Sequence, residues 1–93
     1  MKKMIARQVY YEGRVQGVGF RYTVKSIATG FDVVGFVKNL ADGRVELQAG
    51  GDASEVTAFL DAIAESELAG NIRRSEVHEI APLANARTFK ISF

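Results

Sequence analysis

Residues 13–21, with the sequence GRVQGVGFR, combine three glycines with two arginines, Arg14 and Arg21. Gly13, Gly17 and Gly19 let the backbone adopt positive φ angles, and they let main-chain N–H groups approach a ligand without an intervening Cβ. Several such N–H groups ahead of a helix favour a bound anion, because the free donors and the helix dipole both attract negative charge. Arg21 adds a planar guanidinium that matches two oxygens of a phosphate or carboxylate. The stretch therefore predicts a site for a phosphate-sized anion.

The same stretch also has a purely structural interpretation. Glycine-rich turns between a strand and a helix occur for steric reasons alone, and an arginine in a first helical turn is often merely solvated. Residues 13–21 contain neither GxxxxGK[ST] nor glycines spaced as GxGxxG, so ATP and NAD are not indicated. From these residues alone, the anion site and the steric turn both remain open.

Asn39 is the second residue with chemical potential, because its amide can both donate and accept hydrogen bonds and so orient a water molecule. It precedes the turn at residues 40–43, and its alternative role is only to shape that turn. The sequence has no cysteine and one histidine, His78, which excludes thiolate catalysis, cysteine metal sites and multi-histidine sites. We expect no metal and no cofactor. The remaining chemistry needs no protein nucleophile and suits an activated phosphate with a good leaving group.

Composition indicates one soluble globular domain over residues 1–93. Hydrophobic residues make up 47% of the chain, charged residues 25%, and the net charge is +1. Nothing in this balance indicates bulk binding of nucleic acid or of a membrane surface. No apolar stretch is long enough to span a bilayer, and Arg7 interrupts any signal-peptide core. We expect a cytoplasmic monomer.

The elements that must position Arg21 and Asn39 follow from hydrophobic periodicity. Apolar residues from Phe20 to Phe31 repeat at helical spacing, and Val45, Leu47 and Ala49 alternate as in a strand. The expected elements are a strand over 5–15, a helix over 21–29, strands over 32–39 and 44–49, a helix from about 52 to about 67, and strands over 71–80 and 89–93.

The ends of these elements carry further expectations. Gly30 should end the first helix in a left-handed conformation. Gly50 and Gly51 should end the third strand, after which Asp52 and Glu55 should form a capping box. Arg21 lies in the first turn of its helix, where the dipole disfavours a cation by up to ~1 kcal/mol. An anion bound at the same end would relieve this conflict.

The order β-α-β-β-α-β with a short final strand predicts an α+β fold, the ferredoxin-like α/β sandwich. Right-handed crossovers place both helices on one face of an antiparallel sheet in this architecture. The fold alone decides no function, so the function must be argued from the site.

Residues 13–21 and 35–39, followed by Asp42 and Gly43, resemble the acylphosphatase family, and the likeness covers nearly the whole chain in length, element order and motif spacing. The resemblance implies an enzyme that hydrolyses the carboxyl–phosphate bond of acyl phosphates to a carboxylate and inorganic phosphate. It implies a small-molecule substrate, inorganic phosphate as product or competitive ligand, no metal and no covalent phosphoenzyme.

The resemblance also assigns roles by matching positions. Asn39 would hold the attacking water, and the substrate phosphate would accept that water's proton. The phosphoryl oxygens would be bound by the Arg21 side chain and by loop N–H groups, those of Arg14, Val15, Gln16, Gly17 and Val18. The chain departs from the family pattern over residues 68–80, where the turn carries no proline.

Two competing hypotheses use the same fold. A non-catalytic anion-binding module would need the glycine loop and Arg21 but not Asn39. A single-stranded RNA-binding domain shares the element order, but it needs exposed aromatic residues on its central strands. The strand over 44–49 offers Arg44, Glu46 and Gln48 on its open side, so this hypothesis ranks last.

Overall fold

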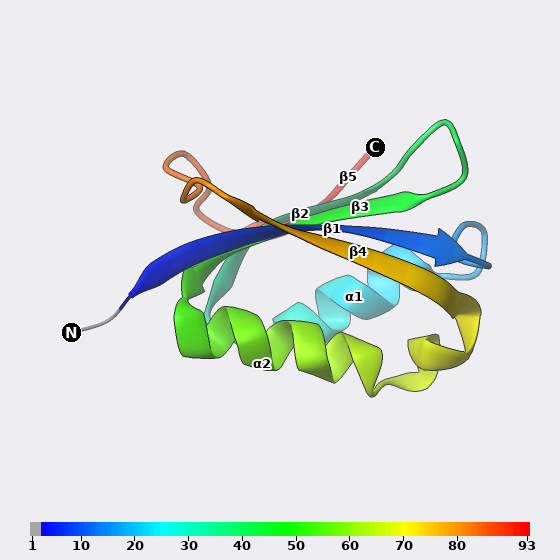
Figure 1. Cartoon of the computed structure of the whole chain (residues 1–93), viewed down its shortest axis with the longest axis horizontal. Helices are drawn as coiled ribbons and strands as arrows, with labels where there is room; N and C mark the ends of the chain where they lie inside the picture. The colour runs from blue at the N-terminus through cyan, green and yellow to red at the C-terminus, as the bar shows by residue number, and fades with distance from the viewer. Residues whose placement is uncertain (1–2) are drawn as a thin grey trace.

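A twisted β-sheet carries two helices against one of its faces (Figure 1) in the computed structural model, which describes residues 3–93. In chain order the elements are β1 (Met4–Gly13), α1 (Phe20–Ala28), β2 (Val33–Asn39), β3 (Val45–Asp52), α2 (Ala53–Ala64), the 3-10 helix η1 (Glu67–Asn71), β4 (Ile72–Ile80) and β5 (Phe89–Ser92). The expected ferredoxin-like βαββαβ architecture, with both helices on one face, is confirmed.

Within residues 3–93 the sheet has five strands in the spatial order β4-β1-β3-β2-β5. Neighbouring strands are antiparallel from β4 to β2, as expected. β5 then pairs with β2 in parallel, a placement that the sequence pattern did not specify. β1 and β2 both run antiparallel to β3, so both terminate at the same end of the sheet, and the glycine loop follows β1 at that end.

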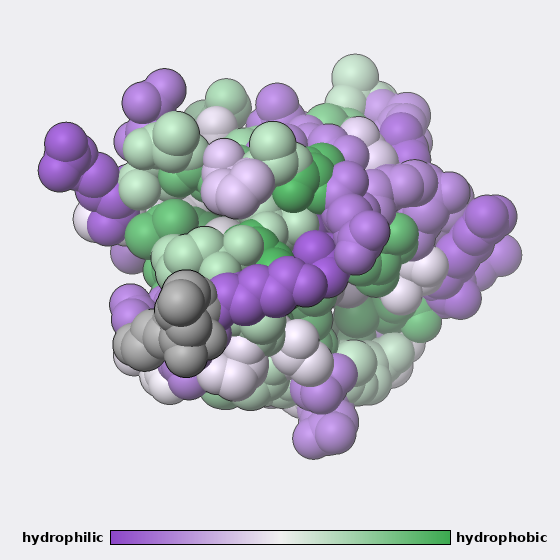
Figure 2. Space-filling view, turned by 60° about the vertical axis from the view of Figure 1, so that its left-hand side comes forward, coloured by the Kyte–Doolittle hydropathy of each residue, from purple (hydrophilic) through white to green (hydrophobic). Residues whose placement is uncertain are grey.

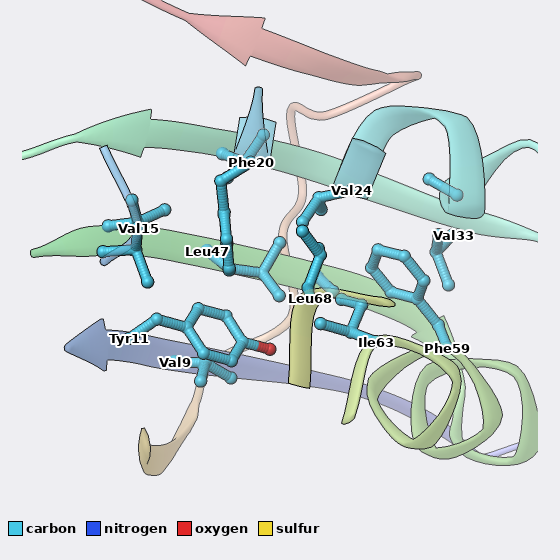
Figure 3. Packing of buried hydrophobic residues seen from close by; sticks show 14 of the residues in the cluster. Val9, Tyr11, Val15, Phe20, Val24, Val33, Leu47, Phe59, Ile63 and Leu68 are labelled. Atoms are coloured by element: carbon cyan, nitrogen blue, oxygen red, sulfur yellow. The ribbon is translucent and has the colours of Figure 1, made fainter. Parts of the chain in front are cut away.

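The core fills the layer between the sheet and the two helices (Figure 3). Phe20, Val24 and Ala28 are the buried face of α1, and their spacing of four residues explains why this segment is an amphipathic helix. From α2, Phe59 and Ile63 are fully buried, and they meet Val9 and Leu47 of the sheet together with the other members of the core. The sheet and both helices are therefore held in one packed unit.

Several predicted boundaries are wrong in ways that the hydrogen bonds explain. β1 ends at Gly13 rather than at residue 15, because Val15 belongs to the loop and is buried there. Gly30 does not have a positive φ. The end of α1 is instead closed by short turns, in which the N–H groups of Gly30 and Phe31 donate to carbonyls three residues earlier, at 3.0 and 3.1 Å.

The junction between β3 and α2 also differs from the expectation. Gly50 and Gly51 do not break the strand but pair with both β1 and β2. No capping box forms: Asp52 accepts from the Ser54 hydroxyl at 3.0 Å, and Glu55 accepts from the N–H of Asp32 at 2.7 Å. The β3 strand therefore leads into α2 without a loop.

The second helix is shorter than predicted. α2 ends at Ala64 rather than near residue 67, and a separate 3-10 helix, η1, begins at Glu67. Ser66 accounts for this break, because its hydroxyl accepts the N–H of Leu68 at 3.1 Å and starts a new helical turn. Leu68 is buried in the core, so η1 also contributes to the layer that covers the sheet.

Candidate functional site

Asn39 and the end of β1 lie in one row across the sheet. Val45 of β3 pairs with Tyr11 of β1 on one side and with Asn39 of β2 on the other. Two strand spacings separate the outer members of this row, which corresponds to about 10 Å between their backbones. The sheet therefore brings Asn39 to the end of the sheet at which the glycine loop begins, close to the hairpin at residues 40–44 (Figure 1).

The loop of residues 14–19 is anchored at two points. Val15 and Phe20 are 1% and 2% exposed, and both belong to the core, where the ring centroid of Phe20 lies 5.3 Å from that of Tyr11. Gly17 and Gly19 lie between these anchors with φ angles of 75° and 77°. This left-handed conformation suits glycine, because other residues meet a steric cost there. The exposed part of the loop is thus short and held at both ends.

The helix α1 begins without a side-chain cap. Its N-cap residue is Gly19, and its first turn contains no acidic residue. The N–H groups of the first turn of an α-helix have no partner within the helix and carry the positive end of its dipole. This end of α1 therefore favours a negatively charged ligand.

The loop N–H groups differ in what they contact. That of Arg14 donates to the carbonyl of Asn71 at 2.9 Å, which ties the start of the loop to the start of β4. Within residues 3–93, the N–H groups of residues 15–18 make no backbone hydrogen bond outside the regular elements. Together with the N–H of Gly19, which also has no backbone acceptor there, these groups are the loop donors that remain for a ligand.

Gln16 connects the loop to the hairpin that follows Asn39. Its Nε2 donates to the carbonyls of Leu40 at 2.8 Å and Arg44 at 2.9 Å. The same Arg44 carbonyl also accepts from the N–H of Leu40 at 2.8 Å. One side chain thereby fixes the loop relative to the end of β2, although the two segments are more than twenty residues apart in sequence.

Arg21 is half-buried in the first turn of α1 and lies against the end of β5. Its Nη1 donates to the carbonyl of Ser92 at 3.4 Å, and its Cζ lies 4.9 Å from the centroid of the Phe93 ring. No carboxylate within residues 3–93 forms an ion pair with Arg21. A carbonyl and an aromatic ring can orient a guanidinium without neutralising it, so its positive charge remains for a ligand.

Asn39 is exposed, and its side chain makes no hydrogen bond within the described part of the chain. The hairpin beside it is well ordered by other groups. The Arg44 N–H and guanidinium donate to the Asp42 carboxylate at 3.0 and 2.8 Å, and these hydrogen bonds hold the pKa of Asp42 below its usual value. The predicted turn over residues 40–43 is confirmed by the N–H of Gly43, which donates to the carbonyl of Leu40 at 3.2 Å.

The structure also bears on metal binding, on the ionisation of Tyr11 and on membrane-spanning helices. Residues 3–93 contain no group of three or more His, Cys, Asp or Glu side chains that could hold a metal ion. Burial raises the pKa of Tyr11 well above that of an exposed tyrosine, so its hydroxyl stays neutral at ordinary pH. Across residues 3–93, no helix has the length and hydropathy to cross a membrane.

Two contacts at the site could not be predicted from the sequence. Gln16 was predicted to contribute only its backbone N–H, yet its side chain donates hydrogen bonds to the hairpin. The one indication of this contact in the sequence was a long amide side chain within a glycine loop. The contact of Arg21 with Ser92 depends on the parallel placement of β5, for which the sequence carried no signal. The predicted loop, the first turn of α1 and the end of β2 do meet at one end of the sheet.

Comparisons with known proteins agree with this arrangement. The acylphosphatase family model matches residues 7–91. An acylphosphatase from Archaeoglobus fulgidus is 38% identical over 90 residues, covering 97% of this chain and all of that protein, and one from Listeria welshimeri is 43% identical over 82 residues, covering 87% and 88%. The crystal structure of acylphosphatase from Bacillus subtilis is similar with a TM-score of 0.86 at 34% identity, covering 96% and 99%. The chain therefore belongs to the acylphosphatase family, the hydrolases that cleave acyl phosphates.

Proposed function

We propose that residues 14–21 and 39, at one end of the sheet, form the active site for hydrolysis of the carboxyl–phosphate bond. The observation that carries this proposal is the set of unpaired donors there: the N–H groups of residues 15–18, the uncapped start of α1 and the unneutralised Arg21 guanidinium. Such preorganised donors stabilise the charge of a transferring phosphoryl group. Arg14 contributes least in this arrangement, because its N–H already has a protein acceptor.

In the proposed mechanism, the loop and Arg21 bind the phosphoryl oxygens, and the Asn39 amide orients a water molecule. The water oxygen attacks phosphorus while the bond from phosphorus to the carboxyl oxygen breaks. The carboxylate leaves with both electrons of that bond, and a phosphoryl oxygen takes the proton of the water. A carboxylate is a good leaving group, since its conjugate acid has a pKa near 4, so no general acid is needed.

The reaction so described requires positioning and charge stabilisation rather than a protein nucleophile. We infer that no metal takes part, because the loop donors and Arg21 supply the positive charge that phosphoryl transfer needs. We further propose that residues 1–93 act as one domain, as a cytoplasmic monomer, with a small-molecule acyl phosphate as substrate and inorganic phosphate as product and competitive ligand.

The open face of the sheet supports the view that nucleic acid is not a partner. Its centre is occupied by the carboxylate of Glu46, which is only 7% exposed. This carboxylate accepts from Gln8 at 2.7 Å and Gln48 at 3.1 Å, and the ammonium of Lys38 lies 3.6 Å away. A carboxylate at this position repels the phosphates of single-stranded RNA, although the rings of Tyr10 and Phe36 lie on the same face.

Hydrolysis of benzoyl phosphate at neutral pH with excess EDTA tests the proposed function. We expect turnover that is unchanged by the chelator and competitively inhibited by inorganic phosphate. In water enriched in oxygen-18, the label should enter inorganic phosphate and not benzoate, because the water attacks phosphorus. Lys25→Ala is a matched control for loss of a cation on α1, since Lys25 is exposed in its last turn, and it should retain full activity.

Three outcomes would overturn the proposal. Loss of turnover with EDTA would require a metal, and label in benzoate would place the attack at the carbonyl carbon. Protection against unfolding by inorganic phosphate, without any turnover, would identify a non-catalytic anion-binding module instead.

A further inference from the structure

A hollow lies at the opposite end of the sheet from the candidate active site. Residues 81–88, which connect β4 to β5, pass over the sheet on the face away from the helices (Figure 1). Leu83 in this segment covers Gly50, and a Cβ placed on Gly50 would lie 3.3 Å from its Cδ1. Between the segment and the strands β2 and β5 is a cavity of about 440 Å³. This volume is in the range of sites for small organic ligands.

The strand pairing gives the hollow a fixed floor. The N–H of Gly35 donates to the carbonyl of Thr88 at 3.0 Å, and Phe36 pairs with Lys90 across the parallel ladder. Paired residues of neighbouring strands point to the same face, so Phe36 and Lys90 both line the hollow. The ammonium group that lies over the Phe36 ring, 5.5 Å from its centroid, is that of Lys38. A floor held by backbone hydrogen bonds does not need to rearrange to accept a ligand.

The charges that line the hollow are of one sign. Arg87 and Lys90 line it, and no acidic residue does. Neither cation forms an ion pair within residues 3–93. Asn85 and Thr88 add polar groups to the rim, and the apolar part is supplied by Phe36, Pro82 and Leu83. Figure 2 shows apolar and hydrophilic surface side by side at this end of the molecule.

We propose that this hollow is a second ligand site, for a small organic carboxylate with an aromatic or aliphatic body. The body would pack against the Phe36 ring and the apolar wall, and the carboxylate would accept hydrogen bonds from Arg87 and Lys90. Charge complementarity selects an anion, and the apolar lining selects an organic anion over a bare inorganic ion. The site shares no residue with the glycine loop, Arg21 or Asn39.

An NMR titration of the full ¹⁵N-labelled chain with 1-naphthoate tests the proposal, carried out with inorganic phosphate in excess so that the candidate active site is occupied. Saturable shifts should appear at residues 82–90 and at Gly35 and Phe36. The neutral analogue 1-naphthamide should bind at least about tenfold more weakly, because it cannot form charge-assisted hydrogen bonds.

Variants locate the site. Arg87→Ala combined with Lys90→Ala should weaken 1-naphthoate binding by about tenfold or more. Arg73→Ala removes an exposed arginine from β4, at the opposite edge of the sheet, and should leave the affinity unchanged. Ala86→Phe places a ring in the hollow and should abolish binding while both cations remain.

The proposal is overturned if the shifts concentrate at residues 14–21, if the amide binds as well as the carboxylate, or if no saturable shift occurs. Unchanged affinity in the folded Ala86→Phe protein would also contradict it, even if the double variant failed to fold.

Discussion

The two junctions at which a strand leads into a helix differ in how the helix begins. At β3–α2, strand and helix are contiguous, and the protein itself supplies negative charge and one acceptor: the N–H of Ala53 donates to the carbonyl of Lys3 at 2.8 Å, and the carboxylates of Asp52 and Glu55 lie at this end. At β1–α1, residues 14–19 intervene, the N-cap is Gly19, and Arg21 takes the place of an acidic residue.

This difference shows how one half of a repeated β-α-β fold becomes a binding site while the other stays structural. Every helix start offers unpaired N–H groups and a positive dipole end. At α2 the chain supplies an acceptor for the first of these groups, that of Ala53, together with two carboxylates, and the junction serves stability. At α1 the glycine loop adds further donors and the chain supplies no acceptor within the described residues, so the same feature is open to an external anion.

Arg21→Ala should have the largest effect, because it removes the only guanidinium in the first turn of α1. We expect kcat/KM for benzoyl phosphate to fall about a thousandfold, in line with the loss of a preorganised donor to a transition state. Arg21→Lys keeps the charge but not the planar fork, and should fall between the two. Steady-state kinetics on samples with native circular dichroism measure this, and near-native rates for Arg21→Ala would contradict the assignment.

Asn39→Ala should reduce kcat about a hundredfold, the scale expected when a reactant loses its orientation. Affinity for inorganic phosphate should change little, because the proposed role of Asn39 is with the water and not with the phosphate. Kinetics combined with isothermal titration of phosphate separates the two effects. If phosphate affinity and kcat fall together, Asn39 belongs to the anion site instead.

Gly19→Asp makes the start of α1 resemble that of α2 by adding a carboxylate. Gly19→Asn is its matched control: both side chains have room, since nothing lies within 4 Å of a Cβ at this position, and both pay about 1 kcal/mol for the left-handed conformation. Phosphate should bind about tenfold more weakly to the Asp variant than to the Asn variant. Equal affinities in titration would show that the start of α1 does not contact the anion.

Glu55→Gln should have the smallest effect, and on stability alone. It removes a negative charge from the start of α2 while keeping an oxygen that can accept from the N–H of Asp32. Urea unfolding should show a loss of about 0.5 kcal/mol. Activity on benzoyl phosphate should equal that of the native chain, and a clear loss would mean that the two junctions are not independent.

Local patterns were enough to predict most of this fold. The alternation in β3 and the four-residue spacing of apolar groups in α1 depend on burial of one face, so they are visible in sequence. The boundaries that were missed depend on competition between hydrogen-bond partners. Glu55 bonds to Asp32 rather than to its own helix, and Ser66 starts a new turn, outcomes set by which groups the tertiary structure brings near.

The candidate site likewise has parts that local sequence patterns predict and parts that depend on contacts between distant residues. The glycine loop and Arg21 are visible as local sequence patterns, and the strand order then explains why Asn39 lies at the same end of the sheet. The acceptors of the Gln16 side chain and of the Arg14 N–H are distant in sequence, at the hairpin and at Asn71. Nothing in a single sequence identifies such partners, because any carbonyl at the right place would serve.

The bonds from Gln16 have a consequence for how the chain tolerates mutation. Both acceptors are backbone carbonyls, which every residue provides, so the identities of the side chains at 40 and 44 do not affect them. The spacing between those carbonyls does matter. Positions 40 and 44 should therefore accept many substitutions as far as these bonds are concerned, whereas insertions and deletions in the hairpin should be tolerated poorly. Variation among functional sequences should preserve the length of the hairpin, together with the glycine that has a φ of 95° at position 43.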